Sequence, residues 1–223
     1  MSTPLRLVIF DVDGTLVDSQ GDIVASMTAA FEDAGLPTPT RPEILSIVGL
    51  SLDVAMARLA PEADTARMVR SYKDSYAALR VRKGAASSPL YPGARAALEQ
   101  ISALDHVLMG VATGKSKRGL DGLIEAHGLE GLFVTRQVAD FHPSKPHPSM
   151  IHAALNETGV DPQCAVMIGD TSYDMDMAAN AGVAGIGVTW GYHPRAHLTA
   201  AHCVIDDFDT LPATLNDIWS VRS

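Results

Sequence analysis

Asp11 and Asp13 stand two positions apart, directly after the apolar residues 5–10, and Gly14 follows them. Two carboxylates at this spacing, beside a glycine that permits a sharp turn, can converge on one divalent cation. Residues 5–10 have the composition of a buried strand, and open parallel sheets bind ligands just beyond the carboxyl ends of their strands. The pattern therefore predicts a catalytic or metal site, with an acidic turn of no chemical role as an equally good alternative.

A second apolar segment, residues 106–112, ends at Thr113 and Gly114. A hydroxyl and open backbone N–H groups at such a position can hold a phosphate oxygen. Taken alone, this pair is ordinary loop chemistry, and Lys115 beside it is expected to be a solvated side chain.

Lys145 lies between Ser144 and Pro146, and His147 and Pro148 follow. The prolines stiffen the backbone around the lysine, which helps to aim its ammonium group. The alternative is an exposed lysine ahead of a helix whose first turn contains Pro148. His147 is expected to point outward or to cap that helix.

Asp170 and Asp174 follow the apolar residues 164–168. If a helix starts near Tyr173, Asp174 lies at its positive N-terminal end, and Asp170 can point at the same cation from the end of the strand. Helix capping by acidic residues is the alternative, and it suits Asp174 better than Asp170. Asp176 should face elsewhere.

Short apolar runs alternate with amphipathic, helix-like stretches along most of the chain, which predicts an α/β fold with a central parallel sheet covered by helices. Helical spacing of apolar positions is clearest in residues 94–104 and 148–158. The predicted strands are residues 5–10, 106–112, 132–134, 164–168, 184–188 and 203–205.

Residues 18–83 interrupt this alternation, because they show helical periodicity and no strand-like run. Such a helical stretch is too long for a simple crossover between two strands. We therefore expect two domains: residues 1–17 and 84–223 form the core, and residues 18–83, here called the helical block, form an insertion. The polar residues 18–21 and the small residues 84–88 would be the junctions.

The composition limits the partners of the chain. Seventeen Lys and Arg against 26 Asp and Glu give a formal net charge of −9 in 223 residues, which disfavours a nucleic-acid backbone. No apolar run approaches the roughly 20 residues of a membrane span, and residues 1–6 lack the basic and apolar pattern of a secretory leader, so we expect no secretory signal. We expect a cytoplasmic protein with Cys164 and Cys203 as buried free thiols; its oligomeric state is not predicted.

The four strand ends together carry a pattern that resembles the haloacid dehalogenase (HAD) superfamily. The residues from Asp11 to Thr15 resemble its first motif, Thr113 its second, Lys145 its third and residues 169–174 its fourth. The resemblance implies a Rossmann-like core, and the helical block resembles the C1-type cap of subfamily I. Within the superfamily, the most similar members are phosphoglycolate-phosphatase-like, on residues 18–19, 91–93, 145–148, 178–182 and 189–192.

The resemblance implies a phosphatase that acts on a small phosphorylated metabolite such as phosphoglycolate. Asp11 would be the nucleophile that forms a phosphoaspartyl intermediate, and Asp13 would be the general acid and base. Mg²⁺ would be held by the Asp11 carboxylate, the Asp13 backbone carbonyl and Asp170, with Asp174 bound directly or through water.

The remaining motif residues would handle the phosphate. By the same resemblance, Thr113, Gly114 and Lys145 would bind the phosphoryl oxygens and offset their charge. The cap would close over the substrate and exclude bulk water.

Other functions on this scaffold stay open. A β-phosphoglucomutase-like sugar phosphomutase uses the same aspartate pair, although residues 18–21 lack the usual histidine, and pyrophosphate is an alternative substrate. Asp13 argues against a dehalogenase, and the absence of any lysine before Lys73 argues against phosphonate hydrolysis. A non-catalytic binding protein is the alternative from another class, since fold alone never proves activity.

Overall fold

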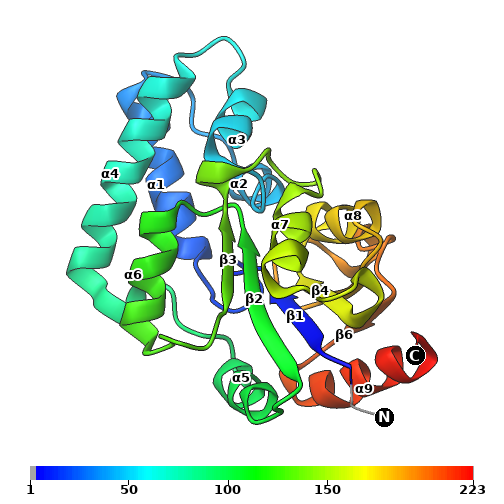
Figure 1. Ribbon diagram of the computed structural model, residues 1–223. Helices are drawn as coiled ribbons and strands as arrows, with labels where there is room; N and C mark the ends of the chain where they lie inside the picture. The colour runs from blue at the N-terminus through cyan, green and yellow to red at the C-terminus, as the bar shows by residue number, and fades with distance from the viewer. Residues whose placement is uncertain (1–3, 223) are drawn as a thin grey trace.

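The computed structural model describes residues 4–222, which form a parallel sheet of six strands flanked by helices (Figure 1). The strand order is β3-β2-β1-β4-β5-β6. Because the chain runs outward from β1 to β3 and then returns to β4 on the other side of β1, a crevice for ligands is expected where the carboxyl ends of β1 and β4 meet. The strands are β1 (Arg6–Phe10), β2 (Val107–Thr113), β3 (Thr135–Val138), β4 (Ala165–Gly169), β5 (Ala184–Val188) and β6 (Cys203–Ile205).

The predicted strand at residues 132–134 is wrong, because the chain enters the sheet only at β3. Phe133 is buried, but Val134 is 56% exposed, so this apolar run is not a strand within the core. The real strand buries Thr135 and Gln137, which hydrogen-bond to each other and to Glu157. Polar side chains that find partners inside the fold do not give the apolar signal by which a buried strand is predicted.

Helices cover both faces of the sheet and account for the rest of the alternation. The predicted helices at residues 94–104 and 148–158 are confirmed as α5 and α7, with slightly shorter bounds. The α-helices are α1 (Gln20–Asp33), α2 (Arg41–Ser46), α3 (Leu52–Leu59), α4 (Thr65–Lys83), α5 (Ala94–Ser102), α6 (Lys117–His127), α7 (Ser149–Thr158), α8 (Ser172–Asn180) and α9 (Leu211–Arg222). Short 3₁₀ turns are η1 (Gly84–Ser87), η2 (Ala139–Phe141), η3 (Pro162–Cys164), η4 (Arg195–His197) and η5 (Phe208–Thr210).

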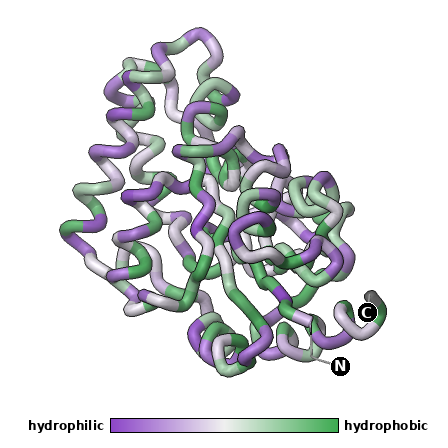
Figure 2. The backbone as a smooth tube through the Cα atoms, viewed as in Figure 1, coloured by the Kyte–Doolittle hydropathy of each residue, from purple (hydrophilic) through white to green (hydrophobic). Residues whose placement is uncertain are grey.

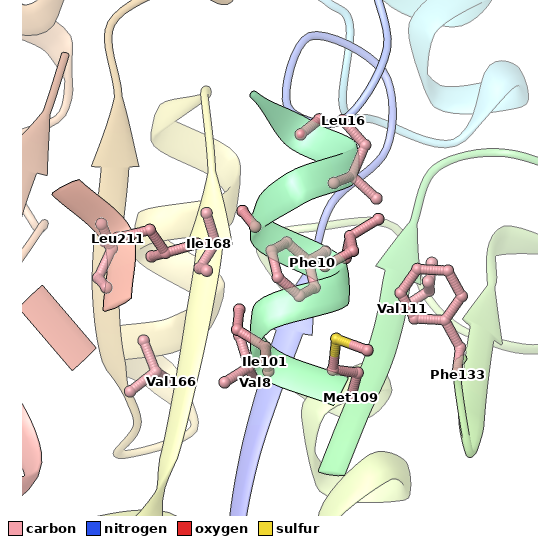
Figure 3. Packing of buried hydrophobic residues seen from close by; sticks show 14 of the residues in the cluster. Val8, Phe10, Leu16, Ile101, Met109, Val111, Phe133, Val166, Ile168 and Leu211 are labelled. Atoms are coloured by element: carbon pink, nitrogen blue, oxygen red, sulfur yellow. The ribbon is translucent and has the colours of Figure 1, made fainter. Parts of the chain in front are cut away.

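Alternate side chains of β1 enter two different cores, as the period of a strand requires. Val8 and Phe10 pack with α5, α6 and α9 on one face, whereas Leu7 and Ile9 pack with α7 and α8 on the other. Figure 3 shows Phe10 and Val8 against Ile101 of α5, with side chains of β2 and β4 on either side. Because β1 is buried on both faces, the residues that follow it have a rigid support.

The helical block contains α1 to α4 and has a hydrophobic cluster of its own, which includes Met27, Ile44 and Met56. Its two connections to the sheet run side by side, since the Asp18 N–H donates to the Pro89 carbonyl and the Tyr91 N–H donates to the Leu16 carbonyl, each over 2.9 Å. In Figure 1 these helices lie at the upper left, beyond the carboxyl ends of the strands. The division into two domains at residues 18 and 84 stays a prediction.

The hydropathy of the chain follows the arrangement of a central sheet covered by helices. Figure 2 shows much of the hydrophobic colour along the central strands and frequent hydrophilic segments on the peripheral helices. Within residues 4–222 no helix combines the length and the apolar character needed to cross a membrane. Cys164 and Cys203 are free thiols, but each is only partly buried, so the expectation of full burial was wrong.

Candidate active site

The aspartates predicted at two strand ends do meet at the crevice between β1 and β4. Asp11 follows β1, and its N–H donates to the Ile168 carbonyl of β4 over 2.9 Å. Asp170 follows β4 directly. Gly14 turns the chain with φ +89° beside Asp170, and a Cβ at this glycine would collide with the Asp170 carboxylate. The glycine is therefore required both for the turn and for the close approach of the two strand ends.

Asp11, Asp170 and Asp174 form a buried carboxylate cluster, in which one oxygen of each lies within 4.8 Å of the others. Their residues are 1%, 0% and 0% exposed. The second carboxylate oxygen of Asp11, Oδ2, is buried and has no hydrogen-bond partner among residues 4–222. Carboxylate oxygens are the ligands that Mg²⁺ prefers, so this cluster with an unpartnered oxygen fits a divalent cation.

Asp174 is held in the cluster by the start of α8. The helix begins at Ser172, one residue before the predicted start, and Thr171 caps it. The Thr171 hydroxyl donates to Asp174 Oδ2 over 2.6 Å, while the Thr171 N–H donates to the same oxygen over 3.1 Å. Capping and a place in the site do not exclude each other for Asp174, because Oδ2 accepts the hydrogen bonds from Thr171 while Oδ1 contacts Lys145. Asp176 is exposed, as predicted.

Lys145 crosses to this cluster from the loop ahead of α7 and is 2% exposed. Its ammonium donates to Asp11 Oδ1 over 2.5 Å and to Asp174 Oδ1 over 2.6 Å. Burial alone would lower the pKa of Lys145, but the carboxylates of Asp11 and Asp174 raise it above its ordinary value. The lysine is therefore a fixed cation inside the site. His147 is exposed and accepts the Ser149 N–H, which agrees with a capping role.

One lysine does not balance three carboxylates at close range. Burial raises the pKa of Asp11 well above its usual range, and the neighbouring charges of Asp174 and Asp170 raise it further, against the opposing effect of Lys145. Burial, followed by the charge of Asp174, raises the pKa of Asp170 to about 7, although hydrogen bonds from the Tyr192 N–H and the Thr15 hydroxyl act against this rise. An added cation would remove this repulsion.

Asp13 does not join the carboxylate cluster and instead forms an ion pair with Lys115. The Lys115 ammonium lies 2.7 and 2.8 Å from the two carboxylate oxygens of Asp13 and 3.2 Å from the Tyr76 hydroxyl. Its side chain is only 8% exposed, so the expectation of a solvated Lys115 was wrong. Burial would lower the pKa of Lys115, but Asp13 and then Tyr76 raise it above its ordinary value.

Ser19 and Tyr192 complete the surroundings of Asp13. The Ser19 hydroxyl donates to Asp13 Oδ1, and the Tyr192 hydroxyl accepts the Ser19 N–H over 3.1 Å. These positions lie in segments that carried the family resemblance, but sequence reasoning assigned them no contact. Their role follows from the return of residues 189–192 to the carboxyl end of β1, which the sequence pattern does not show.

Thr113 and Gly114 end β2 next to these aspartates. Thr113 is buried, and its hydroxyl accepts the Lys115 N–H over 3.2 Å. Gly114 packs against the helical block so closely that a Cβ there would lie 2.5 Å from the Leu50 carbonyl oxygen. The two residues therefore line the place where the core and the helical block meet.

Further contacts between the core and the helical block converge on Ser46, and sequence reasoning missed all of them. The Tyr173 hydroxyl donates to the Ser46 carbonyl over 3.0 Å, and His193 Nε2 lies 3.2 Å from the same oxygen. Since His193 Nδ1 accepts the Ser172 N–H, the ring is neutral with its proton on Nε2. Burial lowers the pKa of His193, which agrees with the neutral form.

A cavity of about 1040 Å³ lies at the end of β2 and extends between the helical block and α6. Asp11, Asp13 and Thr113 line it together with Gly114 and Lys115. The cavity therefore joins the predicted nucleophile, the predicted acid and the predicted phosphate-binding loop in one space. The roles of these residues stay predictions.

Comparisons with known proteins agree with this geometry. A family profile described as "Haloacid dehalogenase-like hydrolase" matches residues 8–188. A Dickeya dadantii protein named "Probable phosphatase IndB" is 36% identical, with 97% of this chain and 96% of its own covered. A phosphoglycolate phosphatase of Agrobacterium fabrum is 34% identical, with 96% and 94% covered.

A solved structure gives the same result at the level of the fold. It belongs to a predicted phosphoglycolate phosphatase from Haemophilus somnus, with a TM-score of 0.80, 26% identity, and 95% of this chain and 98% of that one covered. The profile spans most of the chain, and the relatives align over nearly their whole length. The chain therefore belongs to the haloacid dehalogenase-like hydrolase family.

Proposed function

We propose that this chain is a Mg²⁺-dependent phosphatase that hydrolyses a small phosphomonoester through a phosphoaspartyl intermediate on Asp11. The observation that supports this most directly is the state of the Asp11 carboxylate. One of its oxygens is fixed by Lys145, while the other is buried without a partner beside the cavity. An oriented carboxylate with an unpartnered oxygen, on a residue that lines a substrate space, suits a covalent nucleophile.

Two proton transfers by Asp13 would complete the reaction. Asp11 attacks the phosphorus, the ester bond breaks, and Asp13 gives its proton to the leaving alkoxide. Asp13 then takes a proton from the water that attacks the phosphoaspartate. This step releases phosphate and regenerates the free Asp11 carboxylate. In the structure Asp13 is paired with Lys115 as a carboxylate. Substrate binding must therefore loosen this pair and let Asp13 gain a proton before the leaving group can be protonated.

The carboxylates of Asp11 and Asp170 and the backbone carbonyl of Asp13 would hold Mg²⁺, with Asp174 bound to it directly or through water. When bound, the ion would offset the negative charge of the phosphoryl group and of the carboxylate cluster. Lys145 would fix the angle of Asp11 and oppose the charge that develops on the phosphoryl oxygens. The Thr113 hydroxyl and the Gly114 N–H would bind those oxygens from the end of β2.

The substrate of the chain is a separate part of the proposal. Relatives are named phosphoglycolate phosphatases, which makes phosphoglycolate the reference substrate. The acidic chain, with its formal net charge of −9, favours a small phosphorylated metabolite over a nucleic acid. A sugar phosphomutase and a pyrophosphatase use the same groups and are the alternatives.

Phosphate release from a panel of phosphate esters, sugar phosphates and pyrophosphate in Mg²⁺ tests the proposal. We expect release from monoesters by the wild type and a loss of it in the Asp13→Asn variant, while the exposed Asp176→Asn control stays active. Interconversion of sugar phosphates without net phosphate release would indicate the mutase. No turnover of any compound would indicate a binding protein.

A further inference from the structure

The cavity is much larger than the two-carbon glycolate group. Its volume of about 1040 Å³ reaches the upper end of the ~300–1,000 Å³ range of sites for drug-sized ligands. A substrate as small as phosphoglycolate would leave most of this space to water. The size of the space therefore calls for a larger leaving group.

Much of the side of the cavity that the helical block forms is apolar. Ile23 and Met27 of α1 line it together with Ile47, Val48 and Leu50, and each of these residues is at most 7% exposed in total. Apolar walls of this kind gain free energy when a hydrocarbon surface displaces water from them. They offer nothing to a carboxylate, which loses its hydration without gaining a partner.

Two tyrosines of α4 add an aromatic surface beside these residues. The rings of Tyr72 and Tyr76 stack with their centroids 5.9 Å apart and an interplanar angle of 19°. Both line the cavity, and both pack on the hydrophobic cluster of the helical block. A flat or branched hydrocarbon body can pack on such a surface with little loss of side-chain freedom.

The aromatic surface lies where the leaving group must go. The Tyr76 hydroxyl is 3.2 Å from the Lys115 ammonium, which also lies 4.9 Å from the centre of the Tyr76 ring. Lys115 in turn contacts Asp13, the proposed proton donor to the leaving oxygen. An alcohol that departs toward Asp13 therefore has Tyr76 and Tyr72 as its next neighbours.

Most of the cations near the cavity have other partners within the described residues. Arg80 donates to the Gly119 carbonyl over 3.0 Å, and Lys117 pairs with Asp121. Three more arginines of the helical block also have partners: Arg58 contacts Tyr173, Arg67 contacts Asp33, and Arg41 donates to Gln20. Lys73 and Arg118 line the cavity as exposed side chains, so water already solvates them.

We propose that the cavity takes the phosphomonoester of an apolar, ring-bearing alcohol in preference to a carboxylate-bearing ester such as phosphoglycolate. This inference rests on the proposed phosphatase function and specifies its substrate class. Tyr72, Tyr76 and the apolar residues of α1 are then the groups that determine specificity.

The test compares kcat/KM for benzyl phosphate, ethyl phosphate and phosphoglycolate in Mg²⁺. The leaving alcohols of the first two esters differ mainly by the ring, so the ratio of the two values measures what the ring gains from the cavity. We expect kcat/KM to be at least about tenfold higher for benzyl phosphate than for ethyl phosphate, by the scale of small apolar additions to a pocket. We also expect benzyl phosphate to exceed phosphoglycolate.

Tyr72 variants locate the effect. Tyr72→Ala should lower the ratio of benzyl to ethyl phosphate several-fold, whereas Tyr72→Phe should keep the ratio. If Tyr72→Ala does not fold, the wild-type ratio still decides the question. A wild-type ratio near one, or a preference for phosphoglycolate, would overturn this inference and leave the phosphatase proposal intact. A failure to hydrolyse any ester would instead overturn the phosphatase proposal itself.

Discussion

The Lys115 ammonium lies within 2.8 Å of both carboxylate oxygens of Asp13, in a pair that is nearly closed to solvent. In the proposed mechanism Asp13 must hold a proton to assist the leaving group, and a carboxylate in this pair holds none. Under that mechanism the described arrangement precedes catalysis. The negative charge of an incoming phosphate would compete with Asp13 for the same ammonium, which would give Lys115 a role in both binding and proton transfer.

Replacement of Lys115 by the uncharged Met should lower kcat/KM by about 10²-fold, the scale for loss of one preorganised charge at a reacting centre. Lys115→Arg keeps the charge and should retain more activity than Lys115→Met. Steady-state kinetics on one ester, with circular dichroism as the check of folding, measure this. Equal activity of wild type and a folded Lys115→Met variant would reduce the ion pair to a structural contact.

The sequence predicted the groups that meet at the carboxyl edge of the sheet better than it predicted their partners. Asp11 and Asp170 each follow a strand directly and Thr113 is the last residue of β2, so the parallel sheet alone brings them together. Lys115 also lies close to the end of a strand, two residues after Thr113. Its burial, however, depends on Tyr76 of the helical block, a residue distant in the sequence that contacts the Lys115 ammonium. No local pattern indicates such a contact.

The fold shows the same division between local and long-range information. Strands buried on both faces, such as β1 and β4, were predicted within one residue at each end because they are apolar apart from Arg6 at the start of β1. The predicted position of β3 was wrong because Thr135 and Gln137 are polar residues that are buried only through their hydrogen bonds to Glu157 of α7. The contact between His193 and Ser46 also joins distant segments, so the sequence contained no sign of it.

Mg²⁺ should raise the melting temperature of the protein, because it relieves repulsion among three buried carboxylates. At a free concentration about 100-fold above the dissociation constant, the stabilisation is about 2.7 kcal/mol, or roughly 5–10 °C for a chain of this size. Asp170→Asn should abolish this rise, and the exposed Asp176→Asn should keep it. Calorimetry in chelator and in Mg²⁺ measures the shift, and an unchanged wild-type melting temperature would remove the metal from this site.

His193 should make the contact between core and helical block sensitive to acid. Burial lowers its pKa below 6.5, so the unfolded state takes up the proton first and the contribution of neutral His193 to stability is lost as the pH falls through 6.5. Between pH 7 and pH 5 the wild type should therefore lose more free energy of unfolding than His193→Gln does. Denaturant titrations measure the difference, with the exposed His152→Gln as control. Parallel losses in wild type and His193→Gln would contradict the assignment.

The covalent role of Asp11 is the central claim, and acid quenching of a reacting mixture tests it most directly. Enzyme, substrate and Mg²⁺ are quenched within the first turnover, and the peptides are analysed by mass spectrometry. The mass of one phosphoryl group should be found on Asp11 of the wild type and be absent from Asp11→Asn. The variant should still fold, since the amide removes one of three repelling charges and leaves Lys145 paired with Asp174. Phosphate release by the wild type with an unmodified Asp11 peptide at every quench time, or release at the wild-type rate by Asp11→Asn, would contradict the account.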